Sequence, residues 1–398
     1  MAIGVHYRTD SLIDTPGATS RAGNVWGSSV ASITQGEHNT KAMFGEVDIP
    51  LLADKPLIEL LSLNASLRYT DVSSYGTGTT YKAGLNWQVV PTVMIRATRG
   101  TSFRTPALFE LYLKDESSFI SQRNLDPCYR WGSGLAAGTI TQRQADNCAA
   151  EGASDSRTAS ISANVLTGGG FGTLKAETST SKNIGIIWSP EFADFRISID
   201  YFDIIVNDEV DQLGAANIVR QCYDSPTWPN DPLCSLFDRL PYEGGLTGQI
   251  LTVRDSFLNI ATQKNRGVDI AATYNTEFLG GNLRIDTQHT FQIEDKVELF
   301  AGFERDHNGL MGDSKWVGNL NFTLDYEEWG FFWGIRFVGP ANNFIENNNS
   351  AETTWFQGYP AETTYNIIVD VPTVVYNTFS ISRELPNGFT AVLGMDNI

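Results

Sequence analysis

The chain has 398 residues, and its content of 41% hydrophobic and 11% aromatic residues excludes a disordered or collagen-like polypeptide. A formal net charge of −18 argues against a nucleic-acid-binding protein, which needs a basic face toward phosphate. No apolar run approaches the roughly 18 to 20 residues of a membrane-spanning helix, which excludes a helical membrane protein. The N-terminus has no basic region followed by an apolar stretch, so either the protein is cytoplasmic or its beginning is missing.

Apolar and polar residues alternate with period two through most of the chain, which is typical of strands with one apolar and one wet face. Within residues 60–71, single polar residues separate Leu61, Leu63, Ala65, Leu67 and Tyr69. The same pattern occurs at 80–90, 195–202, 268–278, 282–295 and 318–328. The full count, from residues 2–8 to residues 389–398, gives about thirteen predicted strands.

Short and long connections alternate between these strands. Tight turns are predicted at 52–56, 89–92, 189–194, 279–281, 327–330 and 385–388. The other connections are longer and polar, and the longest, roughly 105–178, has about 70 residues. In an antiparallel meander every second connection emerges at the same end. Soluble sandwiches do not sort their loops in this way, whereas outer-membrane β-barrels do.

The pattern therefore predicts an all-β fold, an antiparallel up-and-down transmembrane β-barrel with its apolar face toward lipid and its polar face toward a wet or plugged lumen. Aromatic residues near strand ends are expected to form interfacial girdles, and the alternative is that they fill a soluble core. These residues are Tyr69, Trp188, Tyr201, Trp329 and Trp333. Because bacterial single-chain barrels have even strand numbers, thirteen strands indicate part of a barrel.

The four cysteines form two local pairs, Cys128 with Cys148 and Cys222 with Cys234, inside polar loop segments. Neither pair has the CxxC spacing of zinc or redox motifs, and none of the four histidines lies near them. We expect disulfides that staple the loops in an oxidising compartment, with free thiols as the alternative. Disulfides argue against a cytoplasmic location.

Motifs of catalysis are missing from the sequence. It contains no HExxH, GxSxG, P-loop or dinucleotide fingerprint, so we expect neither an enzyme nor a bound cofactor. Asp306, Asn308 and Asp313 share one loop and could bind calcium. That loop lacks the spacing and the flanking helices of an EF-hand, so we expect no metal site there.

The alternating strand that includes residue 96 leads into "SFRTPALFELY", residues 102–112. This segment contains an aromatic-Arg-x-Pro sequence followed by Glu-Leu-Tyr. This segment resembles the mid-barrel signature of TonB-dependent outer-membrane receptors. The matching residues are Phe103, Arg104, Pro106, Glu110, Leu111 and Tyr112. The family's Asn-x-Ala pattern followed by Gly-x-Asp is matched by Asn259, Ala261, Gly267 and Asp269, and its Asp-Asn-Leu-Phe-Asp element begins at Asp396 and Asn397. The cysteine loop at 221–240 is also similar to a loop of many members.

The resemblance covers nearly the whole chain and implies that residues 1–398 are a partial β-barrel domain, near strands nine to twenty-one of a 22-stranded plugged barrel. The family's plug domain, its TonB-contacting box, the first strands and the last strand would lie outside this chain. The implied function is a bacterial outer-membrane receptor that imports a scarce nutrient such as a siderophore, vitamin or glycan. The long loops would be extracellular and the short turns periplasmic.

The resemblance also implies partners: outer-membrane lipid, the TonB energy-transducing protein acting through the plug, and an extracellular small-molecule or glycan ligand, but no nucleic acid. Loop aromatics and arginines are the candidates for ligand contact, because rings and guanidinium groups supply contact area and charge at wet sites. They are Arg130, Trp131, Trp228 and Trp355, and the alternative is that they pack the loops together. Arg104 and Glu110 are expected to order the loop base.

Two other function classes stay open at the level of the sequence. A porin-like diffusion channel would share the alternation but would need an inward constriction loop and no plug. A secreted all-β carbohydrate-binding protein would use the loop tryptophans to stack on sugars.

Overall fold

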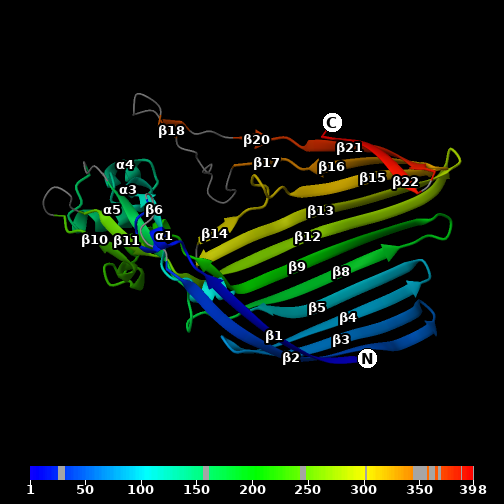
Figure 1. Cartoon of the computed structure of the whole chain (residues 1–398), viewed down its shortest axis with the longest axis horizontal. Coiled ribbons are helices and arrows are strands. Elements are labelled where there is room, and N and C mark those ends of the chain that lie inside the picture. The colour runs from blue at the N-terminus through cyan, green and yellow to red at the C-terminus, as the bar shows by residue number, and fades with distance from the viewer. Residues whose placement is uncertain are drawn as a thin grey trace.

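A computed structural model describes residues 1–25, 32–155, 161–242, 248–300, 303–343, 356–357, 364–365, 369–386 and 388–397. Thirteen strands follow one another in a single antiparallel sheet, whose spatial order is also the chain order (Figure 1). They are β1 (Ala2–Asp14), β2 (Thr34–Lys55), β3 (Ile58–Val72), β4 (Gly76–Val90), β5 (Val93–Arg104), β8 (Glu177–Trp188), β9 (Phe195–Gln212), β12 (Phe257–Phe278), β13 (Gly281–Phe300), β15 (Trp316–Tyr326), β16 (Trp329–Val338), β21 (Val374–Leu385) and β22 (Phe389–Asp396). A short strand, β14 (Phe303–Asp306), pairs with β13 beside this path. The predicted number and order of the strands are confirmed.

The connections are sorted between the two ends of the sheet, as the sequence predicts. The connections at one end, the turn end, are tight: 56–57, 91–92, 189–194, 279–280, 327–328 and 386–388. Those at the other end, the loop end, range in length from 73–75 to 105–176 (Figure 1). Strand β1 leads into the loop-end connection 15–33, and β22 follows the tight turn at 386–388, so both run from the turn end to the loop end.

Strand register separates the sheet into an apolar and a polar face. One row of directly paired residues on seven neighbouring strands is apolar: Leu63, Leu85, Ala97, Ile184, Tyr201, Val268 and Phe291. A row on the opposite face is almost entirely polar or small: Ser62, Asn86, Arg96, Gly185, Asp200, Asp269 and Thr290. In the polar row Arg96 donates to both carboxylate oxygens of Asp200, at 2.8 and 2.6 Å, across Gly185, where a Cβ would collide with the Asp200 carboxylate.

Aromatic side chains gather toward both ends of the apolar face. At the turn end, Trp188 contacts Phe192 and Phe195 with ring centroids 6.3 and 5.9 Å apart. Toward the loop end, Trp316 stacks on Phe291 at 6.0 Å and on Phe337 at 5.5 Å. Of the predicted girdle residues, Tyr69, Trp188 and Trp329 lie near strand ends, whereas Tyr201 and Trp333 lie further inside their strands.

A second unit is built from the two longest described connections at the loop end. Its described residues within 116–167 and 213–254, here called the loop module, form a four-stranded sheet and a set of short helices (Figure 1). The strands are β6 (Glu116–Ser121), β7 (Ser162–Thr167), β10 (Phe237–Arg239) and β11 (Ile250–Arg254). The helices are α3 (Gln122–Leu125), α4 (Trp131–Ala136), α5 (Gln142–Ala150), α6 (Ala215–Asp224) and the 3-10 helix η1 (Pro232–Leu236). The larger of the two apolar cores of the described residues lies in the loop module.

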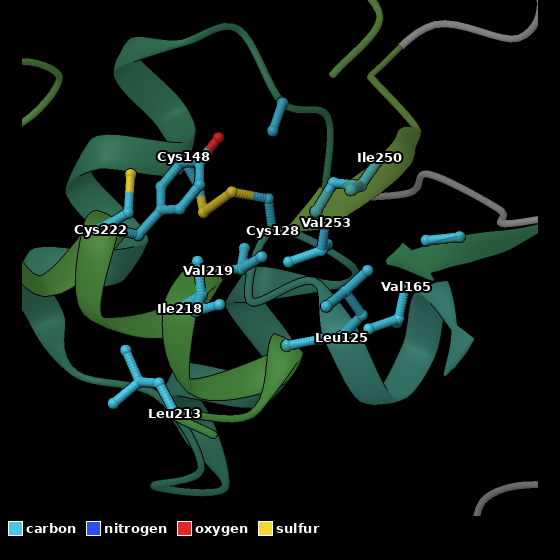
Figure 2. Close-up of a cluster of buried hydrophobic side chains, with 14 residues drawn as sticks. Leu125, Cys128, Cys148, Val165, Leu213, Ile218, Val219, Cys222, Ile250 and Val253 are labelled. Carbon is cyan, nitrogen blue, oxygen red and sulfur yellow. A yellow bond between two sulfur atoms is a disulfide. The ribbon is translucent and has the colours of Figure 1, made fainter. Parts of the chain in front are cut away.

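That core contains fourteen buried residues from both connections, ten of which are labelled in Figure 2. They are Leu125, Cys128, Cys148, Ala153, Ala163, Val165, Leu213, Ala215, Ile218, Val219, Cys222, Tyr223, Ile250 and Val253. Helix α6 contributes its buried face, and β7 and β11, which pair in parallel, contribute two buried residues each. The two connections therefore fold as one body, although residues 177–212, which form β8, a turn and β9, separate them in the sequence.

Other described elements are short. Helices α1 (Ala18–Arg21) and α2 (Leu108–Tyr112) lie in loop-end connections, β17 (Ala341–Asn342) pairs with β20 (Asp370–Val371), and β18 (Phe356–Gln357) pairs with β19 (Thr364–Tyr365). Among the described residues, none of the helices has the length and apolar character required to cross a bilayer.

Candidate functional site

The signature residues meet at the loop end of β5, where Arg104 joins two carboxylates. Its Nε donates to Glu177 at 2.7 Å, and its Nη2 forms a second, very short contact with the same carboxylate. Both Nη atoms also reach Glu110, at 3.0 to 3.1 Å. Arg104 and Glu177 are direct partners in the β5–β8 ladder, so the strand register itself brings the two charges together. We call Arg104, Glu110 and Glu177 the loop-base cluster.

Each carboxylate of this cluster also binds backbone. Glu110 accepts a hydrogen bond at 2.7 Å from the amide of Ala107, the residue before α2, and so fixes the start of that helical turn. Glu177 accepts one at 2.8 Å from the amide of Val210 on β9. Pro106 is fully buried, and because proline disfavours helical geometry in the preceding residue, it separates the strand from the helix. The cluster thus ties the ends of β5, β8 and β9 to α2.

The remaining signature residues pack α2 against neighbouring segments. Leu111 is buried with Leu174 and Val210, and Tyr112 stacks on Phe171 with ring centroids 4.9 Å apart. Tyr112 also lies directly over Gly36 of β2, where a Cβ would overlap its ring. Gly36 belongs to the polar face of β2, so α2 lies on the polar side of the sheet at its loop end, a place here called the mouth of the sheet. Helix α2 bridges there from β5 toward β2.

The backbone of residues 169–171 pairs with α2 and the residue after it. The amides of Gly169, Gly170 and Phe171 donate to the carbonyls of Leu113, Glu110 and Leu111, at 2.8, 2.9 and 3.0 Å. A Cβ on Gly169 would collide with the carbonyl of Leu111. Backbone atoms cannot move aside as a flexible side chain does, so this approach requires glycine.

A Gly169→Ala substitution is therefore expected to open this backbone pairing. Overpacking of this kind costs about 1 to 3 kcal/mol, so exchange of the Gly169, Gly170 and Phe171 amides should accelerate about 5- to 150-fold. Hydrogen exchange with mass spectrometry on the full-length protein measures this. Gly17→Ala is the matched control, since no heavy atom lies within 4 Å of a Cβ at Gly17. Unchanged protection in Gly169→Ala would show that the pairing is not held by this close approach.

The second family pattern lies on β12, next to the loop-base cluster. The side-chain oxygen of Asn259 accepts a hydrogen bond from the backbone amide of Lys175 at 2.7 Å. Its side-chain nitrogen donates to the carbonyls of Lys175 and Asp208, at 3.0 and 2.7 Å. Ala261 is buried between two register shifts of the β9–β12 ladder. Asn259 therefore fixes the segment before β8 to the loop ends of β9 and β12.

The other matched positions are dispersed along the sheet. Gly267 lies at a β-bulge and leaves room for the ring of Phe202. Asp269 accepts a hydrogen bond from Thr290 at 2.6 Å. Asp396 ends β22, and Asn397 follows it in a left-handed conformation. These four residues do not join the loop-base cluster.

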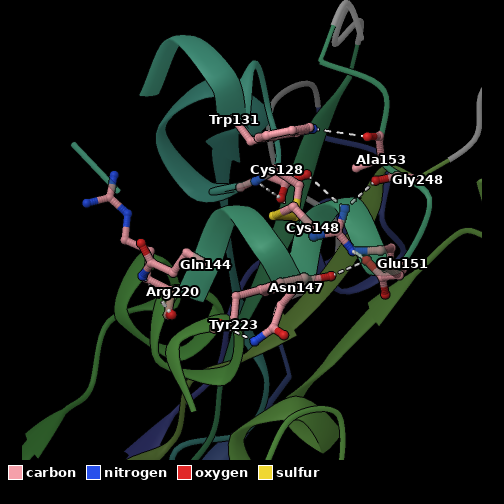
Figure 3. The surroundings of a disulfide bond; sticks show 12 residues. Cys128, Trp131, Gln144, Asn147, Cys148, Glu151, Ala153, Arg220, Tyr223 and Gly248 are labelled. Atoms are coloured by element: carbon pink, nitrogen blue, oxygen red, sulfur yellow. Dashed lines mark hydrogen bonds and ion pairs between the residues drawn. A yellow bond between two sulfur atoms is a disulfide. The ribbon is translucent and has the colours of Figure 1, made fainter. Parts of the chain in front are cut away.

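The four cysteines form the two disulfides expected from the sequence, Cys128–Cys148 and Cys222–Cys234. Figure 3 shows the surroundings of the first. Cys128, Cys148 and Cys222 are buried in the core of the loop module. Trp131 donates to the carbonyl of Ala153 at 3.0 Å beside the first disulfide (Figure 3). The disulfides therefore staple the helices of the loop module to its core.

The candidate ligand residues divide by environment. Trp131 and Trp228 are half-buried and pack against the core of the loop module. Both therefore agree with the alternative to ligand contact, in which these residues pack the loops together. Arg130 is exposed, with its guanidinium 5.6 Å from the ring of Tyr129. Trp355 lies outside the described residues. Arg130 is thus the candidate whose described surroundings leave it open to a ligand.

Sequence reasoning missed the charged centre of the loop module. Arg239 donates to both oxygens of Asp126, at 2.9 and 2.7 Å, and its guanidinium lies 5.2 Å from the ring of Tyr223. Burial alone would lower the pKa of Arg239, but Asp126 more than offsets this and raises it. Burial also raises the pKa of Tyr223, which donates to Glu151. The sequence signal was weak, because Asp126 and Arg239 are 113 residues apart.

In the loop around Asp306 and Asn308, which the sequence offered as a possible calcium site, the polar side chains bind backbone groups. Asp306 accepts the amide of Asn308 at 3.0 Å, and the Asn308 side chain donates to the carbonyl of Ile293 at 3.0 Å. A cavity of about 460 Å³ adjoins these residues and Asp370. Across the part of the chain that the structure describes, no group of three or more acidic, histidine or cysteine side chains has a geometry suited to a metal ion.

Three solved structures illustrate the resemblance of the fold. The siderophore receptor PirA from Acinetobacter baumannii is 12% identical, with a TM-score of 0.59, over 100% of this chain and 47% of that chain. A variant of the ferric enterobactin receptor PfeA from Pseudomonas aeruginosa, in complex with enterobactin, is 15% identical, with a TM-score of 0.60, over 100% and 45%. The FrpB iron transporter from Neisseria meningitidis is 12% identical, with a TM-score of 0.52, over 99% and 47%.

These identities establish the fold alone, and the chain spans about half the length of the structures it matches. The search of curated proteins gave no match. The family model described as "TonB dependent receptor-like, beta-barrel" matches residues 2–398. With the sorted loops and the two-faced sheet, this match means that the chain belongs to the TonB-dependent receptor-like β-barrel family.

Proposed function

We propose that this chain is part of the barrel of an outer-membrane receptor that imports a ferric siderophore, driven by the TonB system. The observation that carries the proposal is the family match over residues 2–398. Solved structures that resemble it include two siderophore receptors and an iron transporter, which favours a siderophore over a vitamin or a glycan. The protein would act as a transporter and not as an enzyme.

The two ends of the sheet receive opposite roles in this proposal. The loop end, with the disulfide-stapled loop module, would be extracellular, where disulfides persist and a ligand arrives. The turn end would face the periplasm. The thirteen strands would correspond to strands nine to twenty-one of a 22-stranded barrel, with the plug that contacts TonB contributed by sequence outside this chain.

Ligand contact is assigned to the loop module and the mouth of the sheet. Arg130 would contribute an exposed charge to an anionic ligand, whereas Trp131 and Trp228 would act by holding the module rigid. Arg104 and Glu110 would order the loop base without contacting ligand, because Arg104 is occupied by Glu110 and Glu177, and Glu110 by Arg104 and the amide of Ala107.

Uptake of radiolabelled iron tests the proposal. Deletion of the full-length gene in the host should abolish uptake of at least one ferric siderophore from a panel of catecholates and hydroxamates. Inactivation of TonB should have the same effect. Unchanged uptake of every member of the panel after deletion of the gene would contradict a role in siderophore import.

A porin-like channel is the second candidate, because one observation favours it. Helix α2 lies inside the mouth of the sheet, with Tyr112 over Gly36, as an inward constriction loop would. Single-channel conductance of the full-length protein in planar bilayers separates the two. A plugged receptor should be nearly closed, whereas a porin should be open.

A further inference from the structure

A row of charged residues borders the apolar face on the side of the loop end. Arg99, Lys182, Asp203, Arg266 and Glu294 are paired in register across β5, β8, β9, β12 and β13. Each lies on the face of its apolar neighbours and follows them toward the loop end. On β8, for example, Lys182 is in line with Ile184 and Ile186. We call these five residues the rim row.

A β-bulge places the last residue of the rim row on this face. Phe291 is on the apolar face, so in a regular strand Glu294 would point to the polar face. The ladder shifts register between Arg266 and Gly267, which makes Ile293 an extra residue and turns Glu294 toward Arg266. Arg266 and Glu294 form an ion pair there. The backbone is thus shaped to place this charge pair at the edge of the apolar face.

Charge is unevenly distributed along the rim row. Glu294 is paired with Arg266 and lies 3.6 Å from Lys296, and Asp203 lies 3.7 Å from Lys182. At the β5 end, Arg99 is exposed and stands directly opposite Lys182, whose side chain is 54% exposed. Within the described residues no ion pair reaches Arg99. Like charges directly opposite each other destabilise a sheet, so the Arg99–Lys182 pair favours the binding of an anion in addition to Asp203.

We propose that Arg99 and Lys182 bind the phosphate groups of outer-leaflet glycolipid. On β5 and β8 the apolar run of this face ends at Arg99 and Lys182, which Thr101 and Thr180 follow toward the loop end. In a bilayer, the level at which an apolar face ends is occupied by lipid head groups. In a chain with a net charge of −18, two adjacent exposed cations at that level complement an anion carried by the membrane. The proposal uses the extracellular position of the loop end from the proposed function, but it is independent of the transported ligand.

Binding of bisphosphorylated lipid A to the full-length protein in neutral detergent tests the site. An Arg99→Gln/Lys182→Gln variant should bind about 25-fold more weakly, since each cation near a head group contributes about fivefold. Lys82→Gln/Arg336→Gln is the matched control, because it removes two exposed cations from the polar face and should bind as the parent does. Retained heat-modifiable mobility on electrophoresis verifies that each variant is folded.

Two further arms identify the source of the phosphate. Dephosphorylated lipid A should bind the parent no better than it binds the double variant, and millimolar inorganic phosphate should not compete with lipid A. Equal lipid A affinity of the parent and the double variant would overturn the proposal, as would full competition by free phosphate. Siderophore uptake by the double variant is measured in parallel. A defect in uptake with normal lipid A binding concerns the proposed transport and leaves this site unaffected.

Discussion

Removal of both disulfides is expected to unfold the loop module while the thirteen-stranded sheet stays intact. Cys128–Cys148 and Cys222–Cys234 close loops of 20 and 12 residues. The chain-entropy model gives about 3 kcal/mol for each loop of this length, or about 6 kcal/mol together. The module has a single core of fourteen buried residues, so a loss of this size exceeds what that core can offset. The four-fold Cys→Ser variant should lose amide protection in α5 and α6, as measured by hydrogen exchange on the full-length protein.

The paired single-disulfide variants separate the two contributions. Cys128 and Cys148 are fully buried, whereas Cys234 is only partly buried against the core. We therefore expect the Cys128→Ser/Cys148→Ser variant to be destabilised more than the Cys222→Ser/Cys234→Ser variant, because it also buries two hydroxyls. Amides in the middle of β8 and β9 serve as the internal control and should keep their protection. Coincident loss of protection in the sheet and the module would contradict the idea that the module unfolds on its own.

Arg104→Ala is expected to release α2 from the sheet. The substitution leaves Glu177, whose side chain is only 8% exposed, without its cation, and it removes the partner of Glu110. An uncompensated buried charge costs about 3 to 5 kcal/mol, and the partial exposure of Arg104 brings our expectation to about 2 to 3 kcal/mol. Proteolysis between residues 105 and 115 should accelerate about 30- to 150-fold in the full-length protein, because the cleavable open state becomes more populated.

A rescue variant distinguishes loss of charge from loss of shape. Arg104→Ala combined with Glu177→Gln removes the buried charge along with its partner, so about half of the lost stability should return. Arg336→Ala is the control, since it removes an exposed arginine from the polar face of β16 without touching the loop base. Proteolysis of Arg104→Ala at the rate of this control would show that the loop-base cluster does not hold α2.

The strands of the large sheet could be predicted from the sequence because the polarity of each residue indicates which face of the sheet it occupies. A strand such as 80–90, with one face toward lipid and one toward the lumen, alternates at every position, and turns such as 279–280 are marked by glycine. No long-range information is needed to read either signal. The order of the strands then follows from the sorted loops alone.

The loop module could not be predicted in the same way. Its core joins residues of two separate connections, as in the pairing of β7 with β11 and of Asp126 with Arg239. Its helices are short, with four to ten residues, so their periodicity is too brief to recognise. Trp131 and Trp228 illustrate the result, because an aromatic residue in a loop looks available for a ligand until its packing partners are known.

The loop-base cluster lies between these extremes. Arg104 and Glu110 were recognisable from the signature, and their role in ordering the loop base was expected. Glu177 was missed, although it is the first residue of β8 and the register partner of Arg104. A charged residue at the start of a strand became informative only when the β5–β8 pairing was known.

The common direction of the two edge strands sets a rule of parity for the barrel. Both β1 and β22 run from the turn end to the loop end, so they would be parallel if they met. An all-antiparallel cylinder that includes this sheet must therefore place an odd number of strands between them, and the strands that dock on β1 and β22 must both descend toward the turn end. Any polypeptide offered in trans to complete the cylinder has to satisfy the same count, which makes nine strands acceptable and eight or ten unacceptable for a total near 22.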